Sequence, residues 1–407
     1  MRSSKSAPRA TATPRRSPEL PEVAGTRVVR LRWRRVAVPL RVTVTNAHAA
    51  YRVRESVLIE VETAGGQRGI GEASLPAGAS FNAYAREIEA FLRAAAMAVI
   101  GRGASDGLAR LQLPAFVPGE WSGATVCGVE TALADLAAVM AGLPLYRWLA
   151  KEASIPLAAA FSEIDVNGLV DLTDPTAAAE GAVALVRDGF RTIKLKVGGS
   201  PERSIATVAA VRAAVGPDVV LRCDANRSWG RTEAEAFVSG CAPYGVALCE
   251  EPLGEPGPDY GALAELRAAS PVPLAVDEST RTLEELERVI AAGAADALVV
   301  KPMASGLTES VAMVCRARDA GLPAIVTTTF DLAPGTSAAM HLAALVGSPG
   351  PACGLGTAGL VEDLLGHGVP DVRRGSITLP ETPGLGIEFD YEAIERYAAG
   401  PWEEAAS

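Results

Sequence analysis

The sequence predicts an α/β fold: a TIM-type (β/α)7β barrel preceded by an N-terminal α+β capping domain, which a C-terminal tail completes. From about residue 157, short apolar runs alternate with amphipathic helical patterns. A charged residue ends five of these runs, at steps of 28, 26, 27 and 24 residues. Steps of this size are typical of one βα unit. The opening differs, because its paired extended runs do not share this rhythm.

The N-terminal segment, residues 1–25, is basic and rich in Ser, Thr, Pro and Ala, with no acid before Glu19. This composition is typical of a disordered extension, and no apolar stretch marks a secretory signal. We therefore expect a cytoplasmic location. Targeting to an organelle by the basic N-terminus is the alternative.

The capping domain is expected over residues 26–135. Its predicted elements are the strand Val57–Glu62, a hairpin turn at Gly65 and Gly66, an extended run that begins over Gly69–Ala73 and a helical region over 82–115. The segments Ala50–Arg54 and Ala73–Ser80 are expected to be loops that close over an active site. Ordinary surface hairpins are the alternative for both segments.

The barrel is expected over residues 136–366. Its predicted strands are Val166–Val170, Thr192–Val197, Val219–Asp224, Val246–Glu250, Leu274–Asp277, Ala297–Lys301, Ala324–Thr329 and a weaker one near Gly354. These runs are apolar without alternation, as in a sheet covered by helices. An even repeat favours closure into a barrel, whereas a doubly wound sheet lacks support because no Gly-x-Gly-x-x-Gly follows a first strand. The irregular tail, 367–407, is expected to return to the capping domain.

Composition excludes several function classes. The net charge of −10 argues against nucleic acid as a partner, since that role requires a basic face. The sequence has no run of 18 uncharged apolar residues, so no membrane contact is expected. Six cysteines without a Cys-x-x-Cys pair are expected to be buried free thiols. Assembly into a homo-oligomer stays open.

Three acids end successive predicted strands: Asp224, Glu250 and Asp277. The C-terminal ends of barrel strands face one mouth, where active sites lie. Three carboxylates gathered there repel one another unless protons or a cation neutralise them. Ligation by oxygen alone favours Mg²⁺ or Mn²⁺ over zinc. Salt bridges to neighbouring Lys and Arg are the alternative explanation.

Lysines flank the acids on both sides. Lys194 and Lys196 lie two apart on one predicted strand and therefore share a face, and Lys301 ends the sixth strand. A desolvated lysine near other cations has a lowered pKa and can act as a general base. A Schiff-base lysine of an aldolase-type barrel is the alternative, but such an enzyme does not need three acids as metal ligands.

These residues resemble the motifs of the enolase superfamily over about residues 27–400. Lys194-Leu195-Lys196 is similar to its K-x-K motif, and Lys301-Pro302 to the lysine on the opposite wall. Lysines on both walls resemble the muconate-lactonizing subgroup. The resemblance implies that the three acids hold Mg²⁺ or Mn²⁺ and that Lys196 takes a proton from a small carboxylate substrate. It also implies that Lys301 stabilises the intermediate, with Lys194, Asn226 and Glu278 in support.

Within the subgroup, the chain most resembles the o-succinylbenzoate synthases, hydro-lyases of menaquinone and phylloquinone biosynthesis. The stretches that carry this resemblance are Val166–Leu169, Asp224–Trp229, Glu250–Leu253, Lys301–Met303 and Gly354–Thr357 followed by Glu362-Asp363. N-acylamino acid racemase, dipeptide epimerase and muconate-type cycloisomerase are alternative activities. A catalytically dead barrel used for binding is another, although all five positions hold competent residues.

The loops that contact substrate depart from the o-succinylbenzoate synthase pattern. Gly306-Leu307 stands where a Gly-Gly pair is common, and Thr327–Asp331 stands where small serines and Glu are common. Thr357–Leu360 also lacks the Asp-x-Asp with which dipeptide epimerases hold an ammonium group. The residues expected to contact substrate are Thr328, Thr329, Gly356 and Arg52.

Overall fold

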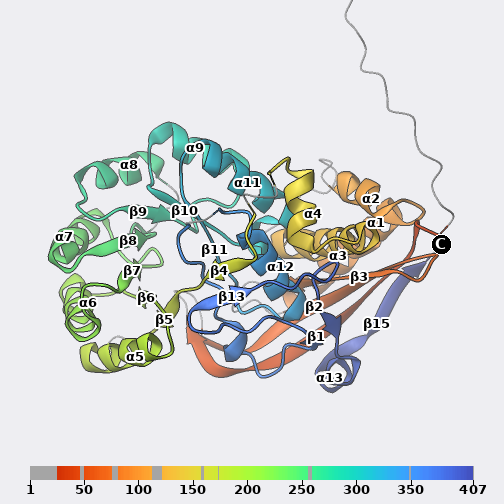
Figure 1. Cartoon of the computed structure of the whole chain (residues 1–407), viewed down its shortest axis with the longest axis horizontal. Coiled ribbons are helices and arrows are strands. Elements are labelled where there is room, and N and C mark those ends of the chain that lie inside the picture. Colours follow the sequence, from red (N-terminus) through yellow and green to blue (C-terminus); the bar gives the residue numbers. More distant parts are fainter. Residues whose placement is uncertain are drawn as a thin grey trace, which may run out of the picture.

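A computed structural model of the chain describes residues 25–406, except 46–49, 76–80, 112–121, 157–159, 173, 255–258 and 348–349. It contains a barrel of parallel strands ringed by helices and, beside it, a separate antiparallel sheet with its own helices (Figure 1). The expected disordered extension, apart from Gly25, and residues 76–80 of one expected closing loop lie outside the described residues.

The capping domain is built on an antiparallel sheet in the order β15-β1-β2-β3. The opening of the chain supplies β1 (Val28–Thr45), β2 (Ala50–Thr63) and β3 (Arg68–Ser74). The tail supplies β15 (Ala398–Ala406), which pairs with β1 so that Arg30 lies opposite Ala406. The tail therefore completes this sheet, as the sequence predicts, and the C-terminus lies at its edge (Figure 1).

Helices α1 (Phe81–Val99) and α3 (Ser122–Ala141) pack on this sheet, and α2 (Ala104–Leu111) packs against both helices. The expected helical region over 82–115 is thus divided, with Gly101 at φ +81 between α1 and α2. Helix α3 lies very close to β3, because a Cβ on Gly71 would stand only 2.0 Å from the carbonyl oxygen of Gly128. Only glycine allows two backbones to approach this closely.

Among the described helices, α3 alone has the length and mean hydropathy, 1.5, that could span a membrane. The protein buries 78% of that window, and α3 packs against β3 on one side and against α10 (Pro302–Ser305) on another. Burial inside the protein explains its apolar character.

The barrel sheet has the order β11-β10-β9-β8-β7-β6-β5, with all pairs parallel. Its strands are β5 (Gly168–Val170), β6 (Thr192–Lys196), β7 (Val220–Asp224), β8 (Val246–Glu250), β9 (Leu274–Val276), β10 (Ala297–Val300) and β11 (Ala324–Val326). Its outer helices are α5 (Pro175–Arg187), α6 (Pro201–Val215), α7 (Arg231–Cys241), α8 (Tyr260–Ala269), α9 (Leu283–Ala292), α11 (Leu307–Asp319) and α12 (Ala333–Ala343). The alternation predicted from residue spacing is confirmed.

The barrel closes through residues 353 and 354. Cys353 forms a parallel bridge with Val166, just before β5, and Gly354 forms one with Thr327, just after β11. The N–H of Gly354 donates to Val326 at 2.9 Å, and Asn167 donates to Cys353 at 3.0 Å. The weak strand expected near Gly354 is thus two single bridges that complete the ring.

The remaining elements join the two parts. They are α4 (Leu145–Glu152), β4 (Glu163–Asp165), β12 (Gly366–His367), β13 (Ser376–Thr378), β14 (Glu388–Phe389) and α13 (Tyr391–Arg396). Strands β4 and β13 pair antiparallel just before β5, so they lie at the N-terminal ends of the barrel strands.

Candidate active site

The barrel strands bring five charged residues to one end of the barrel. In the sheet register Lys196 pairs with Asp224 and Asp224 with Glu250, so these three lie on one level of neighbouring strands. Asp277 follows β9 directly, and Lys301 follows β10. Because all five stand at C-terminal strand ends, they share the mouth of the barrel.

Their side chains point to the inside of the barrel. Lys196, Asp224 and Glu250 alternate with Leu195, Cys223 and Cys249, which are buried in the layer between strands and helices. A separate apolar cluster, Leu248, Ala275, Ala297, Val299 and Ile325, fills the barrel interior beneath them. The same alternation places Cys223 and Cys249 away from the acids, on the opposite face of their strands.

Lys196 and Lys301 stand on opposite walls. The ring has seven strands and one closing segment, and β6 and β10 are four steps apart in either direction around it. Lys196 Nζ donates to Asp224 Oδ2 at 2.8 Å, and Lys301 Nζ forms an ion pair with Asp277. The acids therefore lie between two ammonium groups that approach from opposite directions.

Lys194 bridges two of the acids. Its Nζ lies 2.8 Å from Asp224 Oδ2 and 2.7 Å from Glu250 Oε2, and its side chain is 13% exposed. One cation is therefore already held by these two carboxylates at close range. The Lys194 ammonium group thus shows that Asp224 and Glu250 can hold a positive charge between them.

Burial and neighbouring charge shift the pKa values of these groups. Burial would lower the pKa of Lys194 and Lys301, but nearby carboxylates outweigh it and raise both above their ordinary value. Burial and the Asp224 charge raise the pKa of Glu250 to about 8.

The donor set fits a hard divalent cation. The buried groups are three carboxylates, which offer oxygen donors of the kind that Mg²⁺ and Mn²⁺ prefer. In the described part of the chain, no three His, Cys, Asp or Glu side chains are already gathered around one point as metal ligands. Instead, the acids form ion pairs with Lys194, Lys196 and Lys301, which supply the countercharge.

Asn226 and Glu278 lie where they can orient the charged residues. Asn226 accepts a hydrogen bond from Lys196 Nζ, donates from Nδ2 to Glu278 Oε1 at 3.0 Å and donates from its backbone to Asp224 Oδ1 at 3.1 Å. Its φ of +41 is rare for a residue with a side chain. This backbone at the end of β7 directs the amide between Lys196 and Glu278.

Glu251 is a residue that the sequence analysis did not single out. It is fully buried at φ +43, and its Oε2 accepts from the backbone N–H of Asp277 at 2.7 Å and of Ser279 at 3.3 Å. The Ser279 hydroxyl donates to its other oxygen. Glu251 thus holds the backbone that carries Asp277. In the sequence, a second acid directly after Glu250, in Glu250-Glu251-Pro252, was the feature that could have indicated Glu251.

The residues expected to contact substrate fall into two groups. Thr328 and Thr329 follow β11, and Thr328 Oγ1 lies 2.7 Å from the Thr357 hydroxyl after the closing segment. A Cβ on Gly356 would lie 3.9 Å from the Asn167 carbonyl oxygen, so this glycine borders β5. These three lie around the mouth.

Arg52 lies on β2 in the capping domain, and its contact with substrate stays a prediction. Its side chain is exposed and donates across the hairpin to Thr43 Oγ1 at 2.7 Å. Its neighbour Tyr51 meets the barrel instead, with its ring edge-on to Phe330 at 6.5 Å between centroids. The pairing of β1 and β2 is irregular between Pro39 and Val44, with the extra residues on β1.

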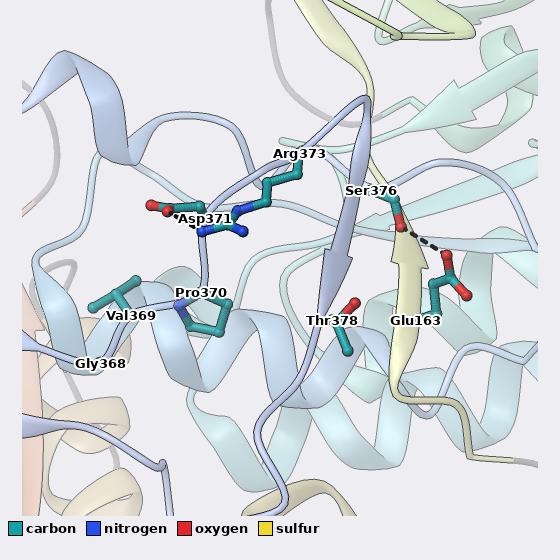
Figure 2. Close-up of a pocket in the computed structure, with 8 residues that line it drawn as sticks. All are labelled: Glu163, Gly368, Val369, Pro370, Asp371, Arg373, Ser376 and Thr378. Atoms are coloured by element: carbon teal, nitrogen blue, oxygen red, sulfur yellow. Dashed lines mark hydrogen bonds and ion pairs between the residues drawn. The ribbon is translucent and has the colours of Figure 1, made fainter.

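A surface groove of about 450 Å³ lies away from this mouth, beside β4 and β13 (Figure 2). It is lined by Glu163, Gly368, Val369, Pro370, Asp371, Arg373, Ser376 and Thr378. Arg373 and Asp371 are 83% and 74% exposed and pair with each other at 3.3 Å. Since its charges satisfy one another in solvent, the groove does not compete with the barrel mouth as the reaction site.

Two family models match the chain. Residues 24–149 match the N-terminal domain of mandelate racemase and muconate lactonizing enzyme, and residues 177–394 match the enolase C-terminal domain-like family. The first match includes β1 to α3 and the first residues of α4, and the second includes β6 to β11.

Curated relatives and a solved structure agree with these matches. The chain is 33% identical to D-Ala-D/L-Ala epimerase of Cytophaga hutchinsonii over 266 residues, 65% of this chain and 69% of that protein. It is 30% identical to muconate cycloisomerase 1 of Rhodococcus opacus over 84% of this chain and 90% of that protein. The structure of a Cytophaga hutchinsonii dipeptide epimerase with Mg and the dipeptide D-Ala-L-Val superposes with a TM-score of 0.78 and 26% identity. That alignment covers 93% of this chain and 99% of that one.

Proposed function

The chain belongs to the enolase superfamily, in the family of mandelate racemase and muconate lactonizing enzyme, and from this membership we propose that it removes the proton α to a carboxylate. One observation carries the proposal. Lys196 and Lys301 stand on opposite walls of the barrel mouth, with Asp224, Glu250 and Asp277 between them.

Each of these residues has a role in the proposed reaction. A Mg²⁺ or Mn²⁺ ion held by Asp224, Glu250 and Asp277 would stabilise the negative charge that develops on the substrate carboxylate. Lys196 Nζ takes the α-proton, and Asn226, which accepts a hydrogen bond from it, fixes its direction. Lys301 Nζ faces the substrate from the other side and stabilises the developing charge as a cation.

We propose dehydration to o-succinylbenzoate as the reaction. In it, Lys196 returns the proton to the departing hydroxyl group on the same face, so one lysine performs both proton transfers. The residues around the closing segment support a substrate side chain without an ammonium group, because Thr328 and Thr357 present hydroxyl groups there. Glu362 contacts the Tyr397 hydroxyl at 3.3 Å and Asp363 pairs with Arg396 at 3.6 Å, so these acids face the tail. A substrate ammonium group, as in a dipeptide, would lack a carboxylate partner there.

Racemisation of an N-acylamino acid is the second candidate. It requires one acid-base group on each face of the substrate, and the opposed positions of Lys196 and Lys301 favour it. The two candidates differ in what they require of Lys301. Dehydration uses it as a cation, whereas racemisation uses it as a proton donor and acceptor.

Deuterium exchange tests the proposal. The purified enzyme is assayed in D₂O with Mn²⁺ on the synthetic dehydratase substrate and on a panel of N-acylamino acids, and α-deuterium is measured by NMR. We expect Lys196→Ala to abolish dehydration and the exchange of the α-proton on the face of the substrate that Lys196 contacts. Lys301→Ala should abolish racemisation but leave α-proton exchange at one face of an N-acylamino acid. Undiminished turnover by Lys196→Ala would overturn the proposal.

A further inference from the structure

The N-terminus of α12 is buried, and a residue of the capping domain satisfies it. All residues of α12, Ala333 to Ala343, are buried, so water cannot reach its first N–H groups. The N–H of Ala333 donates to Leu364 at 2.9 Å, and Pro334 has none. The next N–H, that of Gly335, donates to Glu72 Oε2 at 3.0 Å. Without Glu72 this donor would be buried and unpaired.

Glu72 comes from β3, far away in the sequence, and it is 1% exposed. Its Oε1 accepts from the backbone N–H of Leu332 at 3.0 Å and from the Ser56 hydroxyl at 2.9 Å. A Cβ on Gly335 would lie 2.9 Å from Glu72 Oε2, so only glycine permits this approach. A carboxylate at a helix N-terminus is also stabilised by the helix dipole.

An ion pair beside Glu72 holds the loop that precedes α12. Arg54 on β2 lies 3.4 Å from Asp331, and both side chains are 3% exposed. Asp331 in turn accepts from the backbone N–H of Thr329 at 3.1 Å and from its hydroxyl at 2.6 Å. Between them Phe330 takes φ +65. A residue with a side chain keeps that conformation only where its surroundings fix it. We call the three residues Arg54, Glu72 and Asp331 the interdomain clamp.

The loop held by the clamp borders the proposed active site. It follows β11, the neighbour of β10, whose end carries Lys301. Phe330 packs edge-on against Tyr51. Burial raises the pKa of Tyr51, whereas the charges of Arg54 and Lys301 act to lower it. The N–H of Ser74 also meets Met303 Sδ at 3.2 Å, in the short helix directly after Lys301.

We propose that Glu72 is a positioning residue of the active site: with Arg54 and Asp331 it fixes the 328–332 loop, and thereby Thr329 and Phe330, for substrate binding. The inference rests on the proposed function for the location of the site. Glu72 itself acts through the loop and touches no reacting atom. A capping domain that merely lends stability would leave substrate affinity unchanged.

Glu72→Gln tests this role. The amide fits the same space, but whichever way it turns, its NH₂ faces either the Leu332 or the Gly335 N–H. We expect KM to rise about tenfold or more, with a smaller change in kcat, since misplacement of about 1 Å can cost about a hundredfold. Mn²⁺ affinity should not change.

Asp135→Asn is the matched control. Asp135 is also buried, and its two oxygens accept from the backbone N–H of Ile70 at 2.9 Å and of Leu385 at 2.6 Å. It lies on α3, between β3 and the tail, rather than at the loop. Its replacement creates the same donor conflict, so we expect a lower Tm with KM within about twofold of the original value.

Hydrogen exchange gives a readout that needs no turnover. In Glu72→Gln the peptide covering 327–336 should exchange about tenfold faster or more, whereas Asp135→Asn should leave it unchanged. Gly335→Ala, whose Cβ would meet Met303 at 2.7 Å, Asp331 at 2.8 Å and Glu72 at 2.9 Å, should also speed exchange in this peptide. Unchanged exchange in this peptide, or a KM equal to that of the control variant, would overturn the clamp. If no carboxylate substrate is turned over at all, the proposed function fails and exchange still decides the clamp.

Discussion

Replacement of Glu251 gives a direct test of how the third acid is held. Glu251→Leu keeps the size of the side chain but removes the acceptors of two buried backbone N–H groups, those of Asp277 and Ser279. Each unpaired buried donor costs about 1 to 3 kcal/mol, so the turn that carries Asp277 should rearrange. We expect Mn²⁺ affinity to fall about 10- to 100-fold, the usual effect of losing a group that orients a metal ligand.

Glu251→Gln separates geometry from charge. Its amide oxygen can still accept from both backbone N–H groups, and the Ser279 hydroxyl can reverse its role and accept from the NH₂. This variant should therefore bind Mn²⁺ with nearly the original affinity. Calorimetric titration with Mn²⁺, without substrate, measures the Mn²⁺ affinity of each variant.

Glu130→Leu controls for the loss of a buried glutamate elsewhere. Burial raises the pKa of Glu130 to about 7, as it does that of Glu251, and Glu130 accepts from the backbone N–H of Thr308 at 3.0 Å. Its loss should lower Tm without weakening Mn²⁺ binding. The reasoning is refuted if Glu251→Leu binds Mn²⁺ as tightly as the original chain, or if Glu251→Gln loses as much affinity as Glu251→Leu.

Three further predictions follow from the described residues. Burial lowers the pKa of His341 from 6.5 to about 4, so the unfolded chain binds more protons in that interval, and stability should fall by about 2 kcal/mol from pH 8 to pH 5. Urea unfolding of His341→Gln should lack this part of the pH dependence; identical profiles would contradict it. Gly71→Ala should destabilise by about 2 kcal/mol or more, because its Cβ would overlap the Gly128 carbonyl, whereas Gly359→Ala, with open space around it, should change Tm little. Chelation with EDTA should abolish activity, and Mg²⁺ or Mn²⁺ should restore it; activity that survives chelation would contradict a role for the cation.

The barrel could be predicted from the sequence because its period lies in short-range spacing. The charged residues from Lys196 to Lys301 recur once per βα unit, and each follows an apolar run. Strand ends on one side of a parallel barrel must meet, so their proximity follows from topology alone. The eighth element, near Gly354, was weaker in the sequence because it forms only two bridges.

Contacts between distant parts of the chain could not be predicted in the same way. Glu72 and Gly335 are separated by 263 residues, and nothing in the local pattern of β3 indicates that its acid caps a helix of the barrel. The contact between Tyr51 and Phe330 also joins distant segments, and strand alternation predicts which residues share a face but not what that face meets.

A crystal structure with Mn²⁺ and a carboxylate substrate tests the central claim most directly. We predict an anomalous difference peak in contact with Asp224, Glu250 and Asp277, with the substrate α-carbon between the Lys196 and Lys301 ammonium groups. A peak bound outside these three acids, or either lysine directed away from the substrate, would contradict the account.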